Sequence, residues 1–314
     1  MTKVFIDGSE GTTGLKLQRR LQGRDDITLL SIDRAKRKNI DARIKMINSS
    51  DITVLCLPDA ASIEAVSFAE NDAVKIIDCS TAHRTNPAWA YGFPELAPSF
   101  REAIKTSKRI ALPGCYASGF NAIVYPLVKA GIIAPDYPIT CYAISGYTGA
   151  GKKGIEQYEI VDRSRELDAP RQYALTQEHK HLKEMTEIPA LTRVPFFAPH
   201  ICDYRYGMVV SVPLFADMME KRMTPEELQQ FFANHYAGEP VVKVRELHHS
   251  DNMIGANNFA KRDDMELEIN GNNDRILITT RFDNLGKGAS GAAIQLLNLA
   301  MGAEDETKGL TIGD

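Results

Sequence analysis

The sequence predicts an α/β fold, with a doubly wound parallel sheet in its first part and an α+β domain with a mixed or antiparallel sheet in its second. Three observations support this prediction. A short apolar strand at the N-terminus runs through a glycine-rich loop into a helical pattern. Apolar strand-like runs then alternate with helical segments up to about residue 112. Beyond about residue 191, strand-like runs follow one another and are joined by turn signals.

Composition bounds the possible functions. The chain has 314 residues, enough for two domains, and a formal net charge of −4, which gives no reason to expect a nucleic-acid or membrane partner. Met1-Thr2-Lys3 runs directly into a strand rather than into a signal segment, so we expect a cytoplasmic protein. Five cysteines are widely spread without a C-x-x-C pair, which argues against a disulfide framework and against a zinc site.

The N-terminal strand, residues 3–7, leads into a loop with three glycines. Gly8-Ser9-Glu10-Gly11-Thr12-Thr13-Gly14 has the spacing G-x-x-G-x-x-G, and leucines at helical spacing follow it. Glycines permit a tight turn and the close approach of a pyrophosphate, while the helix N-terminus favours an anion. We therefore expect a Rossmann-type dinucleotide site at Gly8, Gly11, Thr12 and Gly14.

The residues that follow the second strand, at 28–32, indicate whether NAD or NADP is the expected dinucleotide. Asp33 stands where a Rossmann unit contacts the adenosine ribose, and an acidic residue there suits the 2′-hydroxyl of NAD. A basic run follows, however, and such a cluster can bind a 2′-phosphate: Arg34, Lys36, Arg37 and Lys38. A solvated basic loop explains the same letters. The leading expectation is NADP, bound by Arg34 and Arg37.

Two further buried strands, at 52–58 and 74–78, enclose a helical segment at about 61–71. In a parallel sheet, ligands bind beyond the carboxyl ends of the strands. The segment from Asp78 to Arg84 stands at such an end, so Ser80 is a candidate for the cofactor and Arg84 for an anionic substrate. A capped turn is the alternative.

A Pro-Gly turn follows the strand at 109–112 and precedes Cys115 and a helical segment at about 118–130. A thiol at a helix start lies where the helix dipole favours negative charge, which lowers a cysteine pKa and makes the nucleophilic thiolate available. The alternative is a small buried apolar residue, as most free cysteines are. These residues alone leave both interpretations of Cys115 open.

Two segments of the second part contain candidate polar groups. A strand at 139–145 precedes the glycine-rich residues 146–154, which lack the order of a P-loop and so exclude nucleotide hydrolysis, although a lysine such as Lys152 can meet an anionic substrate. His179 and His181 are two residues apart without a cysteine partner, a spacing that argues against a metal. A general acid/base role for one of the two fits better.

The remaining pattern predicts strands, one helix and a closing helix. The strands are expected at 192–197, 208–214, 241–247, 265–269 and 275–282, with a hairpin at 270–273 and a helix at 224–237. The closing helix packs on the first domain, and the polar tail after Gly302 is expected to fray. The expected domains are 1–114, completed by about 286–314, for the dinucleotide, and 115–285 for catalysis and dimerisation.

Four motifs in this order resemble the shorter form of the N-acetyl-gamma-glutamyl-phosphate reductases, within the semialdehyde dehydrogenase superfamily. They are the N-terminal Gly-x-x-Gly-x-x-Gly, Pro-Gly-Cys-Tyr-Ala-Ser-Gly, Ser-Gly-x-x-Gly-Ala-Gly-Lys and Asn-Leu-Gly-Lys-Gly-Ala-Ser-Gly. The resemblance covers nearly the whole chain. It implies NADPH-dependent reductive dephosphorylation of a small acyl phosphate to an aldehyde, in arginine biosynthesis, by a homodimer or homotetramer.

The resemblance also implies roles for single residues. Cys115 is the nucleophile, and the acid/base histidine falls in the pair His179 and His181, of which His181 is favoured. Residues 145–152 and 284–288 lie near the nicotinamide and the substrate, and they include Ser145, Gly146, Gly149, Lys152, Asn284 and Gly286. The roles of Arg205 and His200 stay open.

The implied chemistry agrees with the residues. A thiolate attacks the acyl phosphate, phosphate leaves, and the thioester accepts a hydride, so such a reductase needs both a thiol and a dinucleotide. This coupling favours the catalytic interpretation of Cys115. Two alternatives stay open: the same chemistry on another acyl phosphate, as in aspartate-semialdehyde dehydrogenase or a lysine-pathway relative, and a non-catalytic dinucleotide-sensing regulator.

Overall fold

The structure, a computed structural model, describes residues 1–247 and 252–313, and the chain divides into two compact units. Unit 1 consists of Met1–Pro113 and Ala289–Leu310, and unit 2 of Gly114–Gly288 with the last residues from Thr311. The sequence analysis sets the corresponding limits at residues 114 and 286. Within the described ranges, no helix has both the length and the apolar character needed to cross a membrane.

Unit 1 contains a six-stranded sheet. Its strands are Thr2–Asp7 (β1), Ile27–Leu30 (β2), Ile52–Leu55 (β3), Lys75–Asp78 (β4), Ala90–Tyr91 (β5) and Arg109–Ala111 (β6). They are parallel throughout and lie in the order β2-β1-β3-β4-β6-β5. The chain moves from β1 to one side and then returns to its other side, so the strand order reverses between β1 and β3. Ligands of doubly wound sheets bind at such a reversal.

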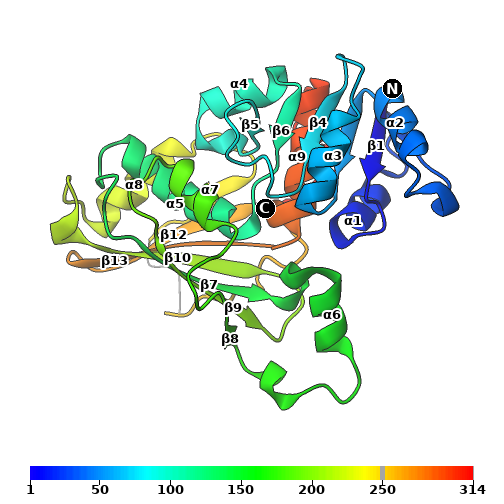
Figure 1. Cartoon of the computed structure of the whole chain (residues 1–314). Coiled ribbons are helices and arrows are strands. Elements are labelled where there is room, and N and C mark those ends of the chain that lie inside the picture. The colour runs from blue at the N-terminus through cyan, green and yellow to red at the C-terminus, as the bar shows by residue number, and fades with distance from the viewer. Residues whose placement is uncertain (248–251, 314) are drawn as a thin grey trace. The chain divides into compact units, whose positions relative to one another are not determined.

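Helices cover both faces of this sheet. Side chains on both faces of each strand are therefore buried, which explains why consecutive residues of the strands are apolar. The helices are Thr12–Leu21 (α1), Ile40–Ser49 (α2), Asp59–Ser67 (α3), Pro98–Thr106 (α4) and Gly291–Met301 (α9). Val4 and Ile6 of β1 share one core with α1, α4 and α9, whereas Phe5 shares the other with α2 and α3. Figure 1 shows α9, from the C-terminal end of the chain, beside β4.

The C-terminal tail is ordered by hydrogen bonds, so the expectation that it frays is wrong. Asn298 of α9 donates to the carbonyls of Glu306 and Lys308, and Arg24 donates to Asn298 and Lys308. Glu306 also pairs with Arg101 of α4 at 3.1 Å. A polar composition suggested fraying, but the polar groups have partners within unit 1.

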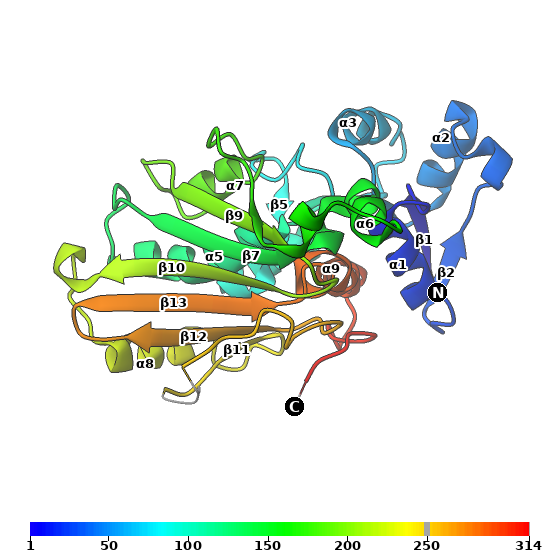
Figure 2. The same ribbon diagram turned by 90° about the horizontal axis from the view of Figure 1, so that it is seen from below.

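Unit 2 contains a seven-stranded mixed sheet. Its strands are Thr140–Gly146 (β7), Arg171–Gln172 (β8), Phe196–Cys202 (β9), Met208–Phe215 (β10), Val242–Val244 (β11), Met265–Gly271 (β12) and Arg275–Phe282 (β13). The order is β11-β12-β13-β10-β7-β9-β8, and β7 with β9 and β11 with β12 are the parallel pairs. Figure 2 shows the strands from β9 to β11 side by side. The hairpin expected at 270–273 joins β12 to β13.

Helices pack on one face of this sheet and leave the other open. They are Cys115–Lys129 (α5), Leu182–Glu187 (α7) and Pro225–His235 (α8), while Gly151–Glu159 (α6) follows β7. Gly119 lets α5 approach the sheet closely, because a Cβ there would lie 2.6 Å from Thr280 Oγ1 and 2.8 Å from Val210 Cγ2. In α8, Thr224 and Glu227 form a capping box.

Several boundaries differ from the sequence predictions, and two of them concern the segments around Cys115 and Pro199. The helix expected from about residue 118 begins at Cys115, so the cysteine is its first residue. The strand expected at 192–197 is β9, Phe196–Cys202, and it extends through Pro199. Proline argues against a strand because it lacks an N–H donor, yet at Pro199 the carbonyl oxygen is used, accepting the Tyr173 N–H.

Candidate active site

The glycine loop of unit 1 is shaped by close backbone packing. Gly8 has φ +90°, and a Cβ there would lie 2.4 Å from the carbonyl oxygen of Cys56. A Cβ at Gly14 would lie 2.4 Å from the carbonyl oxygen of Gly8. At Gly11 the nearest atom would be 3.5 Å away, an ordinary contact, so the chain itself does not require a glycine there. Gly11 thus keeps space free at the loop surface, as the approach of a pyrophosphate requires.

The helix that follows the loop presents an uncompensated N-terminus. Gly11 is the residue before α1 and has no side chain to accept its first N–H groups, and the first turn, which begins at Thr12, contains no acidic residue. Such a helix start stabilises an anion through its N–H groups and its dipole. The loop and α1 together fit the pyrophosphate of a dinucleotide.

A cavity of about 330 Å³ extends from this loop along the end of β2. Arg34, Arg37 and Lys38 line it, and Asp33 does not. The Asp33 carboxylate accepts the N–H of Ala35 at 2.8 Å and caps the short turn Arg34–Lys36. Glu10 of the glycine loop lies 3.4 Å from Arg34 and 3.7 Å from Arg37. The basic residues therefore line the cavity, whereas the carboxylate of Asp33 accepts a hydrogen bond from the backbone of the turn.

The segment after β4 forms a buried hydrogen-bonded cluster around Asp78. Ser80 Oγ donates to Asp78 at 2.6 Å, Ser62 Oγ does so at 2.9 Å, and His83 Nδ1 lies 2.6 Å from the same carboxylate. Arg84 donates to the carbonyls of Leu112 and Cys79. Ser80 and Arg84, predicted to contact ligands, thus organise the carboxyl edge of the unit 1 sheet.

Cys115 is the first residue of a fifteen-residue helix in unit 2. Gly114 precedes it with extended backbone, and no acidic residue occupies the first turn of α5. Negative charge on the Cys115 sulfur is therefore stabilised by the helix N-terminus. The N–H of Gly114 donates to the buried carboxylate of Glu184 at 2.9 Å, which ties the start of α5 to α7. Sequence analysis did not identify Glu184, which lies within a polar run.

A second cavity, of about 210 Å³, lies beside Cys115 within unit 2. It is lined by Cys115, Tyr116, Ser145, Gly146, Gly149, Ala150, Tyr173, His179, Lys180 and Ile201. The structure thus brings together the thiol, the glycine-rich loop after β7 and one histidine of the predicted pair. Tyr116 and Tyr173 were not singled out in the sequence. The position of Tyr116 directly after the cysteine is the one signal that pointed to it.

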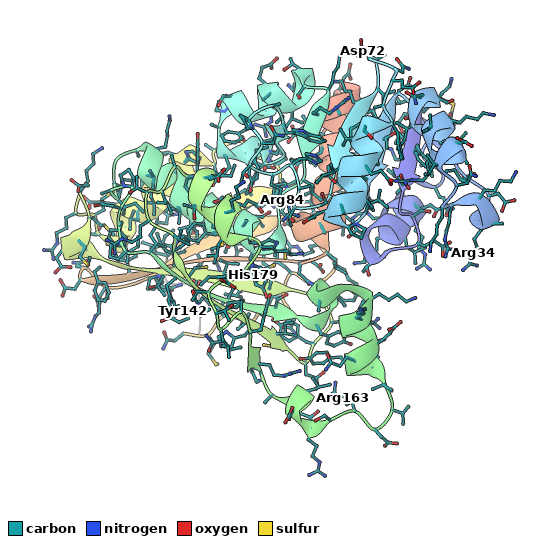
Figure 3. The ribbon with its side chains drawn as sticks, in the orientation of Figure 1. Arg34, Asp72, Arg84, Tyr142, Arg163 and His179 are labelled. Carbon is teal, nitrogen blue, oxygen red and sulfur yellow. The ribbon has the colours of Figure 1, made fainter. Side chains whose placement is uncertain are left out.

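The two histidines differ in their surroundings. His179 lines the cavity, and Figure 3 labels it beside the unit 2 sheet. His181, which the resemblance favours, precedes α7, has 4% of its surface exposed and is not among the residues that line the cavity. Their ring centroids are 4.8 Å apart, and both rings contact Tyr116. Burial, with a smaller effect of Lys180, lowers the pKa of His179 to about 4.

Tyr116, the residue after Cys115, is a buried phenol that lines the same cavity. Its side chain hydrogen-bonds with Tyr173 and Ser145, and burial raises its pKa well above the usual value. Burial also raises the pKa of Tyr173. Both hydroxyls therefore keep their protons at neutral pH and can act as hydrogen-bond donors in the cavity.

The glycine-rich loop and the segment at 283–288 pack closely around this cavity. A Cβ at Gly146 would lie 2.7 Å from the carbonyl oxygens of Tyr204 and Arg205, and one at Gly288 would lie 2.9 Å from Cys115 Cβ. Gly286 similarly accommodates the carbonyl of Arg262. Asn284, predicted to bind cofactor, accepts the Gly207 N–H at 2.9 Å and donates to Thr148 at 3.0 Å. The Asn284 side chain thus links Gly207 to the loop that contains Thr148 and Gly149.

Three candidates lie outside the Cys115 cavity. The side chain of Lys152 is 80% exposed and lies 3.9 Å from Glu156 on α6. Arg205 pairs with Glu159 at 2.9 Å. His200 lies on β9 with its Nδ1 3.2 Å from the carbonyl of Ala198. Lys152 and Arg205 thus lie beside glutamates of α6, and His200 contacts the backbone of its own strand.

Comparison with known protein families matches almost the whole chain. Residues 3–107 match the model of the semialdehyde dehydrogenase NAD binding domain, and residues 115–284 match the semialdehyde dehydrogenase dimerisation domain. These ranges correspond to the glycine loop with the unit 1 sheet and to Cys115 with the unit 2 sheet.

Curated relatives have a more specific name. The chain is 44% identical over 307 residues to N-acetyl-gamma-glutamyl-phosphate reductase of Sinorhizobium medicae, covering 96% of this chain and 99% of that protein. It is 42% identical to N-acetyl-gamma-glutamyl-phosphate reductase 2 of Pseudomonas putida, covering 96% and 97%. Among solved structures, aspartate semialdehyde dehydrogenase II of Vibrio cholerae matches with a TM-score of 0.73 at 17% identity, covering 97% and 99%. At that identity the likeness shows the fold alone.

Proposed function

The chain belongs to the N-acetyl-gamma-glutamyl-phosphate reductase family, and on that premise we propose that it reduces N-acetyl-gamma-glutamyl phosphate to N-acetylglutamate semialdehyde, with release of phosphate, in arginine biosynthesis. The family membership supports a cytoplasmic biosynthetic enzyme. Fold likeness alone would fit the same chemistry on other acyl phosphates, whereas the 44% identity over nearly the full length favours this substrate.

One observation carries the proposal. Cys115 begins a long helix and lines a cavity with a histidine and two neutral phenols, all within unit 2. A structural cysteine in a core would need none of these neighbours. A thiolate at a helix start, open to a cavity with hydrogen-bond donors, is the arrangement that covalent catalysis at a carbonyl requires.

The proposed reaction has two steps, formation of a thioester on Cys115 and reduction of that thioester. The Cys115 sulfur attacks the carbonyl carbon of the acyl phosphate, the C–O bond to phosphate breaks, and a thioester forms. When bound, the dinucleotide supplies the hydride that reduces the thioester. A histidine of the pair His179 and His181, with His181 favoured as the acid/base group, accepts the proton of the Cys115 thiol and later donates a proton to the carbonyl oxygen that the hydride addition leaves negative. Ser145 and Gly146 line the cavity and hold the substrate beside Cys115.

For the cofactor, we propose NADPH, bound by Gly8, Gly11, Thr12 and Gly14 at the pyrophosphate and by Arg34 and Arg37 at the 2′-phosphate. The family model supports a nicotinamide dinucleotide. The arginines support the phosphorylated form, because they line the cavity while Asp33 caps a turn. Guanidinium groups match phosphate oxygens better than they match a ribose hydroxyl.

The proposal includes a homodimer or homotetramer formed through unit 2. The matched family model for residues 115–284 is described as a dimerisation domain. The face of the sheet opposite α5 and α8 carries large exposed apolar side chains, among them Tyr142 on β7, Phe196 on β9 and Phe215 on β10. Exposed apolar surface of this kind marks interaction sites in soluble proteins.

An enzyme assay in the reverse direction tests the function. Purified protein is mixed with NADP⁺, phosphate and N-acetylglutamate semialdehyde, and formation of NADPH is followed beside an identical reaction with aspartate semialdehyde. We expect phosphate-dependent reduction with the acetylated aldehyde and at least a hundredfold lower kcat/KM with the other, since an unmatched polar group costs about 10²-fold or more. Equal rates would reassign the substrate, and no reduction with either would support a dinucleotide-sensing regulator.

A further inference from the structure

The hydrogen bonding of His179 determines which of its ring nitrogens carries the proton. The N–H of His181 donates to Nδ1 of His179 at 3.1 Å. The same turn is closed by a main-chain bond of 2.9 Å from the N–H of Leu182 to the carbonyl of His179. A nitrogen that accepts a hydrogen bond carries no hydrogen, so a neutral His179 has its proton on Nε2.

The other nitrogen, Nε2, is accessible on a ring that lines the cavity. The ring of His179 lines the same cavity as the Cys115 thiol. Within residues 1–247 and 252–313, Nε2 of His179 has no hydrogen-bond partner, and it is not one of the buried unpartnered atoms of this part of the chain. An Nε2–H is therefore available to a substrate that occupies this cavity.

The surroundings of His179 keep the ring neutral. Four rings pack around it at centroid distances from 4.8 to 5.9 Å, those of His181, Phe197, Tyr173 and Tyr116. The charged group that acts on it is Lys180, which disfavours a second positive charge, and the other titratable groups of the cavity are Cys115 and the two phenols. Burial and Lys180 lower its pKa to about 4, so we expect a ring that is neutral near pH 7.

We propose that His179 is a catalytic hydrogen-bond donor of fixed tautomer, whose Nε2–H binds the substrate oxygen that becomes negative when the Cys115 sulfur adds to the carbonyl carbon. This proposal rests on the proposed function. The hydrogen bond moves no proton: the oxygen receives the electron pair of the C=O bond, and the Nε2–H stabilises it in place. A neutral imidazole suits this task because its Nε2–H donates a hydrogen bond but is too weakly acidic to transfer its proton to the oxygen.

This assignment separates the roles of the two histidines. A group that takes the thiol proton must be able to accept one, and Nε2 of His179 already holds a hydrogen while Nδ1 is occupied by the His181 N–H. Acid/base transfer therefore falls to another group, with His181 as the proposed one.

Two substitutions at position 179 separate hydrogen-bond donation from proton transfer. His179→Gln places an amide N–H₂ near the position of Nε2 and keeps a donor. His179→Asn places its amide near Nδ1, where the oxygen still accepts the His181 N–H, but leaves no donor at Nε2. We expect His179→Gln to keep kcat within about tenfold and His179→Asn to lose about 10²–10³-fold, the range for removal of one oxyanion donor. His200→Asn is the matched control: His200 does not line the cavity, and the variant keeps the main-chain carbonyl that accepts the Tyr116 hydroxyl, so it should retain activity.

Nitrogen NMR of the ¹⁵N-histidine protein gives a readout that does not depend on turnover. The signals of His179 are assigned by their loss in His179→Gln. We expect the shift of an unprotonated Nδ1 and a protonated Nε2, unchanged from pH 5.5 to 8. A protonated Nδ1, a titration in this range, or equal losses of kcat in both variants together with loss of an ionisation from the pH profile would overturn the proposal. The expected tautomer in a protein without the assayed activity would instead contradict the proposed function alone.

Discussion

At the scale of single residues, the proposed reactivity of Cys115 depends on its place in the first turn of α5. The five cysteines of the chain occupy different environments: Cys141 is fully buried on the sheet and its pKa is raised by desolvation, whereas Cys115 begins a helix and lines a cavity. We therefore expect the thiol of Cys141 to be unreactive and the thiol of Cys115 to be nucleophilic.

The first prediction follows from this contrast. Iodoacetamide should alkylate Cys115 faster than Cys141 or Cys202 near neutral pH, because alkylation requires the thiolate and burial raises the pKa of both other thiols. Cys115→Ser should fold normally and lose nearly all activity. Peptide mass spectrometry over time measures the labelling rates. Cys141→Ser is the matched control for the Cys115→Ser substitution and should keep its activity. Labelling of Cys115 no faster than that of the buried thiols would contradict its role.

The second prediction concerns His181. If it transfers the proton, His181→Asn should lower kcat by about 10²–10⁴-fold, the usual loss for a general acid or base, with the dissociation constant of the dinucleotide unchanged. An ionisation should also disappear from the pH dependence of kcat. Steady-state kinetics over pH and fluorescence titration with NADPH measure both quantities. Near-normal kcat with an unaltered pH profile would exclude His181.

At the scale of secondary-structure elements, the loop after β1 and the turn Arg34–Lys36 after β2 line one cavity, which is the proposed nucleotide site. Gly8 and Gly14 are required by the backbone, whereas Arg34 and Arg37 line the cavity from the neighbouring strand. The carboxylate of Glu10 lies 3.4 Å from Arg34 and 3.7 Å from Arg37. Because these pairs are solvent-exposed, they contribute little to stability and can open for a phosphate.

The third prediction tests this arrangement. Arg34→Ala together with Arg37→Ala should raise KM for NADPH by about 10- to 100-fold, as expected when hydrogen bonds to a charged group are lost, and should change KM for NADH little. Arg19→Ala, an exposed position on α1 that does not line the cavity, is the matched control. Equal effects on the two dinucleotides would show that the basic run is solvated surface and would give Asp33 the greater weight.

The elements also show what the sequence could and could not predict. Strand, glycine loop and helix were predictable at the N-terminus because each is a local pattern of apolar spacing and glycine. The start of α5 was placed three residues late, because a Pro-Gly turn obscures the first helical position. The strand β9 was misplaced because Pro199 interrupts the expected pattern. Only the pairing of β9 with β7 and β8 shows that the sheet tolerates the missing N–H of Pro199.

At the scale of the whole molecule, the site residues that escaped prediction are those brought together by tertiary contacts. Tyr173 and Lys180 come from a polar stretch without periodicity, yet they line the cavity beside Cys115. Glu184 reaches Gly114 across seventy positions of the chain. No local signal encodes such contacts, since they depend on how α7 packs on α5. By contrast, Cys115, Ser145 and Gly146 lie in motifs and were identified from the sequence.

The last prediction concerns the open face of the unit 2 sheet. Thr140, Tyr142 and Phe196 lie on this face because β7 pairs with β9 in parallel register, Thr140 opposite Phe196, and side chains alternate along a strand. Tyr142 and Phe196 expose about half of their surface, 51% and 52%, and Figure 3 shows Tyr142 on the side of the sheet away from α5. If this face joins two copies, light scattering should give at least twice the chain mass of 34.8 kDa.

Tyr142→Arg with Phe196→Arg should then reduce the particle to one chain, because each interface would have to bury unpaired positive charge. Ile160→Arg provides the matched control: it is equally apolar and exposed, but it follows α6 and lies outside the sheet. Circular dichroism and thermal unfolding of the variants distinguish loss of assembly from loss of folding. A folded double variant that keeps the mass of the parent protein would place the contact between copies on another surface.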